Sequence, residues 1–157
     1  MVAREMLARL DHLATEIGAL HSKLILLVGG PHTGKTALLA AFAERMDAKT
    51  LNVGSELGRR LAAIPQKQRH LQVGTVLREL ADEHAKGDLL LLDNIELLFD
   101  TTLQLNPLDL LKRHAHSRRV VAVWPGGLRD GRLAYAEMGH SEHRDYATDG
   151  LVALEMQ

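Results

Sequence analysis

The 157-residue chain contains no cysteine, which excludes disulfide bonds, zinc sites built from thiolates and catalysis by a thiol. Aromatic residues are scarce at 3%, whereas apolar residues make up 46%, so we expect a mainly aliphatic core. Long apolar runs are missing: the longest, such as Leu24–Val28, fall far short of the ~20 residues that cross a bilayer. Because Arg4 and Glu5 also make the N-terminal segment polar, we expect no signal peptide, no membrane contact and a cytoplasmic location.

Neither sign of charge is in excess, since 19 Lys and Arg residues accompany 20 Asp and Glu residues for a formal net charge of −1. This balance gives the chain no overall attraction to nucleic acid. Two local groups are nevertheless basic: one contains Lys112, Arg113, Arg118 and Arg119, and the other Arg59, Arg60, Lys67 and Arg69. These groups are either solvated helix faces or a contact surface for DNA or an acidic partner.

Apolar residues follow two patterns along the chain, helical spacings and short continuous runs. Helical spacings predict helices over 2–19, 35–46, 55–63, 75–85 and 107–116. Short runs predict strands at 23–28, 49–53, 89–93 and 120–124, and Asp130-Gly131 predicts a hairpin before a last strand at 151–154. Strands that alternate with helices indicate an α/β fold, with a mostly parallel sheet and helices on both faces.

Residues 29–36 match the phosphate-binding pattern G-x-x-x-x-G-K-[ST] between a predicted strand and a predicted helix, the context that the motif requires. The candidate binding residues are Gly29, Gly30, Pro31, His32, Thr33, Gly34, Lys35 and Thr36. Glycines let successive amides point at phosphate oxygens, and the start of the helix adds partial positive charge. Lys35 is expected to reach the β and γ phosphates, and Thr36 to bind Mg²⁺. The motif therefore predicts a P-loop NTPase that binds a nucleoside triphosphate with Mg²⁺, and ATP is favoured by general prevalence.

Asp93 is the second candidate for the site, because it ends the apolar run Leu89–Leu92. We expect this strand to lie beside the P-loop strand, which would bring Asp93 to the edge of the sheet where ligands bind. There it would hold Mg²⁺ opposite Thr36, and we expect Lys35 and Asp93 to act in catalysis. The alternative is that Asp93 only caps a loop.

The residue that positions the attacking water is less clear from the sequence. Many proteins of this architecture place a Glu directly after the Asp, whereas this chain has Asn94. Glu96 is the next acid and our catalytic candidate, while Glu56 and Asn94 remain alternatives.

Arginines are candidates for stabilising the transition state. Arg118 and Arg119 precede the strand at 120–124, so they should lie at the edge of the sheet away from the phosphates. Arg129, Arg132 and Arg144 follow that strand, so they start on the correct edge. Any of these three could act within its own chain or across an oligomer interface.

No long linker, repeat or low-complexity tract divides the chain, so we expect one domain over residues 1–157. It would comprise an N-terminal amphipathic helix (1–21), a nucleotide-binding core (23–124), and a hairpin with a C-terminal strand (125–157). Because little sequence follows Trp124, we expect a minimal core without a helical lid domain.

Several segments outside the P-loop point to one family. They are LNVGSEL (51–57), DLLLLDNIELLF (88–99), VWPG (123–126) and YAE (135–137), followed by His140, His143 and Tyr146. With these segments the chain resembles the BrxF family of small P-loop NTPases from BREX (bacteriophage exclusion) defence systems. The resemblance implies a bacterial cytoplasmic ATPase that works with other BREX components, such as a large ATPase or a DNA methyltransferase. We further expect a homo-oligomer, and any contact with DNA to be indirect.

Three functions remain in competition at this point. The leading one is an ATPase subunit whose nucleotide state controls assembly with defence partners. A nucleotide-binding scaffold with little or no hydrolysis is the second, motivated by Asn94 in place of a Glu. A small-molecule phosphotransferase is the third, although the arginine-bearing lid that such enzymes insert is not evident in the sequence.

Overall fold

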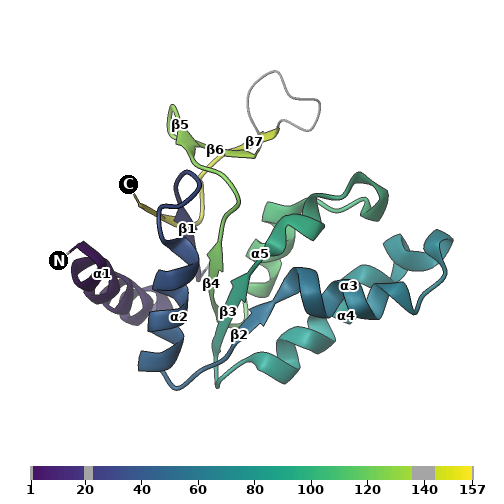
Figure 1. Ribbon diagram of the computed structural model, residues 1–157, viewed down its shortest axis with the longest axis horizontal. Coiled ribbons are helices and arrows are strands. Elements are labelled where there is room, and N and C mark those ends of the chain that lie inside the picture. Colours follow the sequence, from purple (N-terminus) through teal and green to yellow (C-terminus); the bar gives the residue numbers. More distant parts are fainter. Residues whose placement is uncertain (1, 20–22, 136–143, 157) are drawn as a thin grey trace.

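A computed structural model describes residues 2–19, 23–135 and 144–156 of the chain. Five parallel strands form the main sheet in the order β2-β3-β4-β1-β8 (Figure 1). Their bounds are Leu24–Val28 for β1, Thr50–Asn52 for β2, Leu89–Asp93 for β3, Arg119–Val123 for β4 and Val152–Glu155 for β8. The expected α/β fold with a mostly parallel sheet is therefore confirmed.

The strand order differs from the expectation in one respect. β4 pairs with β1 on one side and with β3 on the other, so the strand that ends in Asp93 is not adjacent to the P-loop strand. The physical reason is that β1, β3 and β4 are all short apolar runs, buried almost throughout. Such runs show that a strand is central, but they do not show which strand it pairs with.

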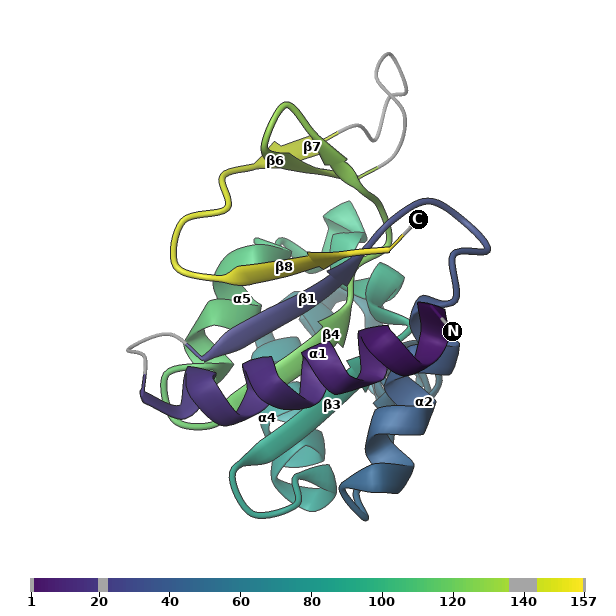
Figure 2. The same cartoon turned by 90° about the vertical axis from the view of Figure 1, so that its left-hand side faces the viewer.

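Helices cover both faces of the sheet, as expected (Figures 1 and 2). One face carries α1 (Val2–Glu16) and α2 (Lys35–Arg45), and the other carries α3 (Val53–Ala62), α4 (Arg69–His84) and α5 (Pro107–His114). Short 3-10 helices add η1 (Ile17–Ala19), η2 (Gln66–Gln68), η3 (Ile95–Phe99) and η4 (Thr101–Leu103). Side chains of β1 alternate between the two cores, with Leu26 in one and Ile25 and Leu27 in the other.

Two helices begin earlier than the sequence predicts. Val53 opens α3 instead of ending β2, because the side chain of Asn52 caps the helix by accepting the Ser55 amide at 3.0 Å. The next helix, α4, begins at Arg69 instead of Thr75, so Gly74 lies in its interior. Because glycine is a poor helix former, the sequence pattern predicts a helix only after Gly74, from Thr75 onward.

A second, three-stranded antiparallel sheet contains β5 (Leu128–Arg129), β6 (Arg132–Tyr135) and β7 (Arg144–Tyr146). The predicted hairpin is confirmed, since Asp130 and Gly131 both have positive φ, at 53° and 75°, between paired β5 and β6. β7 was not predicted. His140 and His143, which contribute to the family resemblance, lie outside the described residues.

An aromatic cluster joins the small sheet to the main one, and both views place the small sheet above the parallel sheet (Figures 1 and 2). Phe99 stacks on Tyr135 with ring centroids 3.9 Å apart, and Trp124 meets Tyr146 edge-on at 5.5 Å. The Trp124 indole also donates a hydrogen bond to the Ala134 carbonyl at 3.1 Å. Within the described ranges, no helix has the length and apolar character needed to cross a membrane.

Candidate nucleotide-binding site

The P-loop connects β1 to α2, and its backbone requires glycine at two positions. Gly29 has φ 149° and Gly34 has φ 86°, both in the region that side-chain-bearing residues rarely adopt. A Cβ on Gly29 would lie 2.5 Å from the Met156 carbonyl oxygen and 2.9 Å from the Thr33 hydroxyl. The conformation of the loop thus follows from the two terminal glycines of the motif.

The start of α2 faces this loop with free amides. Gly34 is the N-cap residue and has no side chain that could accept a hydrogen bond. The first hydrogen bond of the helix runs from the Leu38 amide to the Gly34 carbonyl, at 2.9 Å. The amides of the first helical turn therefore have no partner within the helix. Together with the positive end of the helix dipole, they form an anion-binding position.

Lys35 extends from the first residue of α2 across the base of the loop. Its ammonium group donates to the Gly29 carbonyl at 2.7 Å and to the Trp124 carbonyl at 2.9 Å. Burial lowers the pKa of Lys35, an effect that the negative charges of Glu96 and Asp93 oppose. Bound phosphate oxygens would compete with these two carbonyls for the ammonium group.

Thr36, on α2, and Asp93, at the end of β3, meet across the cleft, although β4 separates β3 from the P-loop strand β1. The Thr36 hydroxyl donates to Asp93 Oδ1 at 3.3 Å, and the same carboxylate oxygen accepts the Asn94 amide at 2.8 Å. A hydroxyl beside a carboxylate is a donor set that suits Mg²⁺ when phosphate and water complete the octahedron. The described residues contain no cluster of three or more His, Cys, Asp or Glu side chains that could hold a metal ion by themselves.

Asn94 follows Asp93 in the left-handed conformation, with φ 53°. Its side-chain amide donates to Asn52 Oδ1 at 2.9 Å, and its carbonyl accepts the Gly54 amide at 2.9 Å. A Cβ on Gly54 would lie 2.6 Å from the side-chain amide nitrogen of Asn94, so a larger residue at this position would displace that amide group. Asn52 is a site residue that sequence reasoning missed, and its position at the end of a strand was the signal that could have identified it.

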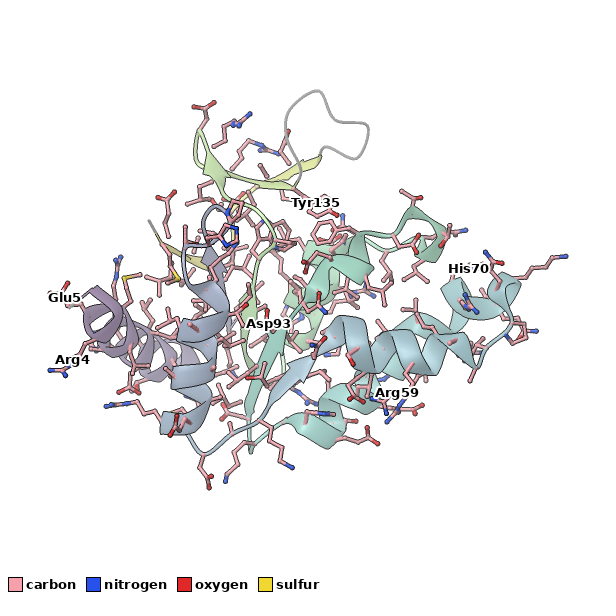
Figure 3. The ribbon with its side chains drawn as sticks, in the orientation of Figure 1. Arg4, Glu5, Arg59, His70, Asp93 and Tyr135 are labelled. Carbon is pink, nitrogen blue, oxygen red and sulfur yellow. The ribbon has the colours of Figure 1, made fainter. Side chains whose placement is uncertain are left out.

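These residues line a cleft of about 360 Å³. The lining residues are Lys35, Thr36, Asn52, Asp93, Asn94, Glu96, Val123 and Pro125. Glu96 reaches the cleft from η3 and is exposed, whereas Glu56 pairs with Arg59 at 2.8 Å and does not line it. Of the two acids considered for positioning water, only Glu96 lines the cleft together with Asp93. Figure 3 labels Asp93.

Of the candidate arginines, Arg129 and Arg132 are not among the residues that line the cleft. Arg129 and Arg132 lie on β5 and β6, and Arg132 pairs with Asp145 at 2.8 Å. The side chain of Arg144 lies outside the described part of the chain. Arg119 binds Asp88 at the start of the strands, away from the cleft, as expected.

Neither a protein-family model nor a curated protein sequence matches this chain. Solved structures do match. A DNA replication initiation factor is 18% identical with a TM-score of 0.52, over 96% of this chain and 44% of its own. The replication initiator DnaA, bound to AMPPCP and single-stranded DNA, is 18% identical with a TM-score of 0.53, over 100% of this chain and 46% of its own.

PCH-2 of C. elegans is similar to the same degree, with 18% identity and a TM-score of 0.53 over 99% of this chain and 43% of its own. The chain therefore spans less than half the length of these solved proteins. At this identity the likeness concerns the fold alone. The chain has the fold of a P-loop NTPase.

Proposed function

We propose that the protein is a Mg²⁺-dependent ATPase subunit. The observation that carries this proposal is the contact between Thr36 and Asp93. Thr36 directly follows the P-loop lysine, and Asp93 ends β3, which lies two places from the P-loop strand β1 in the sheet. Residues 57 positions apart in the sequence meet at 3.3 Å where a P-loop protein would bind Mg²⁺. ATP is favoured because the similar DnaA structure contains AMPPCP, an analogue of ATP.

Four residues of the cleft, together with the backbone amides of the P-loop, have defined parts in this proposal. The amides of the P-loop and of the α2 N-terminus bind the phosphates, and Lys35 exchanges its two carbonyl acceptors for phosphate oxygens. Thr36 and Asp93 hold Mg²⁺, which neutralises charge on the phosphates when bound. Glu96, exposed in the cleft, accepts a hydrogen bond from the attacking water and orients it.

The biological setting that we propose is BREX-type phage defence in the bacterial cytoplasm, where the nucleotide state controls assembly with partners. The sequence resemblance supports this setting, and the large ATPase or the methyltransferase of such systems would be the partner. The cleft adds a physical argument for assembly. Among its described lining residues Lys35 is the one cation, and we propose that a neighbouring subunit supplies an arginine to the cleft.

A nucleotide-binding scaffold with little hydrolysis is the second candidate, and Asn94 favours it. Asn94 occupies the place where many such ATPases have a catalytic Glu. Its amide group is engaged with Asn52, so it holds the cleft together without carrying a carboxylate that could activate water. In this case Glu96 would be a solvated residue at the rim.

The experiment that separates these candidates measures Mg·ATP affinity and steady-state phosphate release for the same preparations. We expect slow turnover in the wild type, no turnover with weakened binding in Lys35→Ala, and loss of Mg²⁺-dependent turnover with binding retained in Asp93→Ala. Lys49→Ala is the matched control, because Lys49 is exposed and outside the cleft. Tight binding without turnover would favour the scaffold, and unchanged turnover in Lys35→Ala would refute the site.

Assembly is tested by specific activity as a function of protein concentration. Turnover per subunit should rise as subunits associate or when a BREX partner is added, since an added arginine increases rates of this reaction by ~10³–10⁵. Replacing Arg129, Arg132 or Arg144 by Ala should abolish that rise while sparing nucleotide binding in one of the three cases. Activity that is independent of concentration and insensitive to all three replacements would contradict the proposal.

A further inference from the structure

A second and larger cavity, of about 460 Å³, lies between α4 and α5 and shares no lining residue with the nucleotide cleft. It is lined by His70, Leu71, Val73, Gly74, Thr75, Arg78, Asp82, Leu105, Leu110, Arg113, His114, Ser117 and Arg118. His70, at the outer end of α4, marks its position in Figure 3. We refer to this cavity as the α4–α5 groove. Its size is in the range of pockets that bind ligands.

Cations dominate the lining of the α4–α5 groove. Arg78 and Arg113 are exposed and form no ion pair within the described residues, while Arg118 pairs with Asp82 at 2.7 Å. Asp82 is the one acid among the described lining residues. The groove thus retains two unneutralised arginines that converge from two different helices.

The charges of the groove also affect the pKa of His114. The pKa of this half-buried residue is lowered, first by burial and then by Arg118, Arg113 and Arg78, with Asp82 opposing. All three arginines therefore act on one point within the groove. An anion bound there would oppose them and raise the pKa of His114.

Gly74 is the second observation that points to an occupant. It lies in the interior of α4, where glycine destabilises a helix relative to alanine. A Cβ at this position would meet no atom of the described chain within 4 Å, so packing within the protein does not require glycine. A bare backbone on the wall of a groove permits a ligand to approach closely.

Apolar side chains accompany the cations. Val73 and Leu110 are buried at the base of the groove, Leu105 is half-buried, and Leu71 is 69% exposed. Among the described residues, Leu71 is the one large apolar side chain that is exposed. Cations beside an apolar base complement a ligand that carries both negative charge and apolar side chains.

We infer that the α4–α5 groove is a docking site for an acidic segment of a partner protein, one that presents apolar side chains between its carboxylates. Single-stranded nucleic acid fits the groove less well, because its described lining has no Phe, Tyr or Trp on which bases stack. The inference goes beyond the proposed ATPase function, and it does not depend on nucleotide binding.

The test measures fluorescence anisotropy with the full chain, without nucleotide, at about 0.05 M salt. Three fluorescein-labelled probes are compared: a peptide of Asp, Glu and Leu, a peptide of the same length with Lys in place of the acids, and oligothymidine. We expect binding of the acidic peptide alone, and weaker binding at about 0.5 M salt. Binding of oligothymidine without the acidic peptide would assign the groove to nucleic acid and overturn the inference.

Variants then locate the binding surface. The double variant Arg78→Glu with Arg113→Glu should weaken binding of the acidic peptide at least about tenfold. The matched control reverses two exposed charges elsewhere, Arg4→Glu with Lys49→Glu, and should bind as the wild type does. Equal loss in both double variants would show a nonspecific charge effect and refute the docking site.

Gly74 separates folding from docking. Gly74→Gln places a long side chain in the groove, so it should abolish peptide binding while its circular dichroism and thermal midpoint match or exceed those of the wild type. The His114 ring signals in NMR provide the independent readout, since the acidic peptide should raise the pKa of this histidine. Unchanged binding in Gly74→Gln, or an unchanged His114 titration at saturating peptide, would exclude the α4–α5 groove as the binding surface.

Discussion

Two adjacent glycines of the P-loop should respond in opposite ways to the same substitution. Gly29 has φ 149°, and a Cβ there would lie 2.5 Å from the Met156 carbonyl oxygen. The Met156 amide donates to the Val28 carbonyl at 2.8 Å, which keeps the backbone of Met156 beside the start of the P-loop. A Cβ on Gly30, in contrast, would meet nothing within 4 Å, and Gly30 is not among the residues with positive φ. Gly30→Ala is therefore a matched control for Gly29→Ala.

The magnitudes follow from these two environments. An alanine in a conformation that favours glycine costs about 1–3 kcal/mol, and the overlap with a backbone oxygen brings the total for Gly29→Ala to about 2–5 kcal/mol. Gly30→Ala should leave the free energy of unfolding unchanged or raise it by about 0.4–1 kcal/mol, because it restricts the unfolded chain. A small protein has about 5–15 kcal/mol of stability, so both variants should remain folded enough to measure.

Urea unfolding followed by circular dichroism gives the two free energies, and calorimetry with Mg·ATP gives the corresponding affinities. Gly29→Ala should lose both stability and nucleotide binding. Gly30→Ala should retain its stability. Any loss of nucleotide affinity in this variant would come from contact between the added methyl group and the nucleotide, and not from a change in the fold. Equal unfolding free energies for the two variants, within about 1 kcal/mol, would refute the conformation assigned to Gly29.

Three further predictions concern the cleft and its surroundings. Glu96→Gln should slow phosphate release at least about tenfold with nucleotide affinity kept, whereas Glu56→Gln should not slow it; the reverse result would transfer the role to Glu56. Nucleotide affinity should fall as pH rises through the lowered pKa of Lys35, because phosphate attracts only the protonated ammonium; affinity that stays constant up to pH ~10.4, where an exposed lysine titrates, would contradict this. Trp124→Phe should reduce the free energy of unfolding by about 1–3 kcal/mol in urea titrations, because the Ala134 carbonyl loses its indole donor; an unchanged value would show that water replaces it.

The sequence was sufficient for the parts of the fold that local patterns determine. The P-loop has a specific residue spacing, the buried strands are short apolar runs, and the turn is an Asp130-Gly131 pair. Each of these local patterns is compatible with few other structures. The nearness of Thr36 to Asp93 also followed, because the carboxyl ends of parallel strands share one edge of the sheet. The assignment of residues 1–157 to one domain stays a prediction.

Long-range relations could not be obtained in the same way. The position of β4 between β1 and β3 depends on which apolar runs pair, and these runs are chemically alike. The contact of Asn52 with Asn94 links two strand ends 42 residues apart, and nothing in either segment alone predicts it. β7 is short and polar, with Arg144 and Asp145 in it, so no apolar alternation marks it as a strand.

The aromatic cluster connects the proposed chemistry to the rest of the fold. Lys35 donates to the carbonyl of Trp124, and the indole of the same residue holds Ala134 of the small sheet. Phe99, at the end of the short helix that carries Glu96, packs edge-on against Trp124 and stacks on Tyr135. When phosphate draws the Lys35 ammonium away, the Trp124 carbonyl loses a charged donor in a half-buried site, and a buried carbonyl without a partner is costly. If the proposed nucleotide binds, the change would therefore fall on the residue through which the antiparallel sheet is attached, because Trp124 contacts both Lys35 and Ala134.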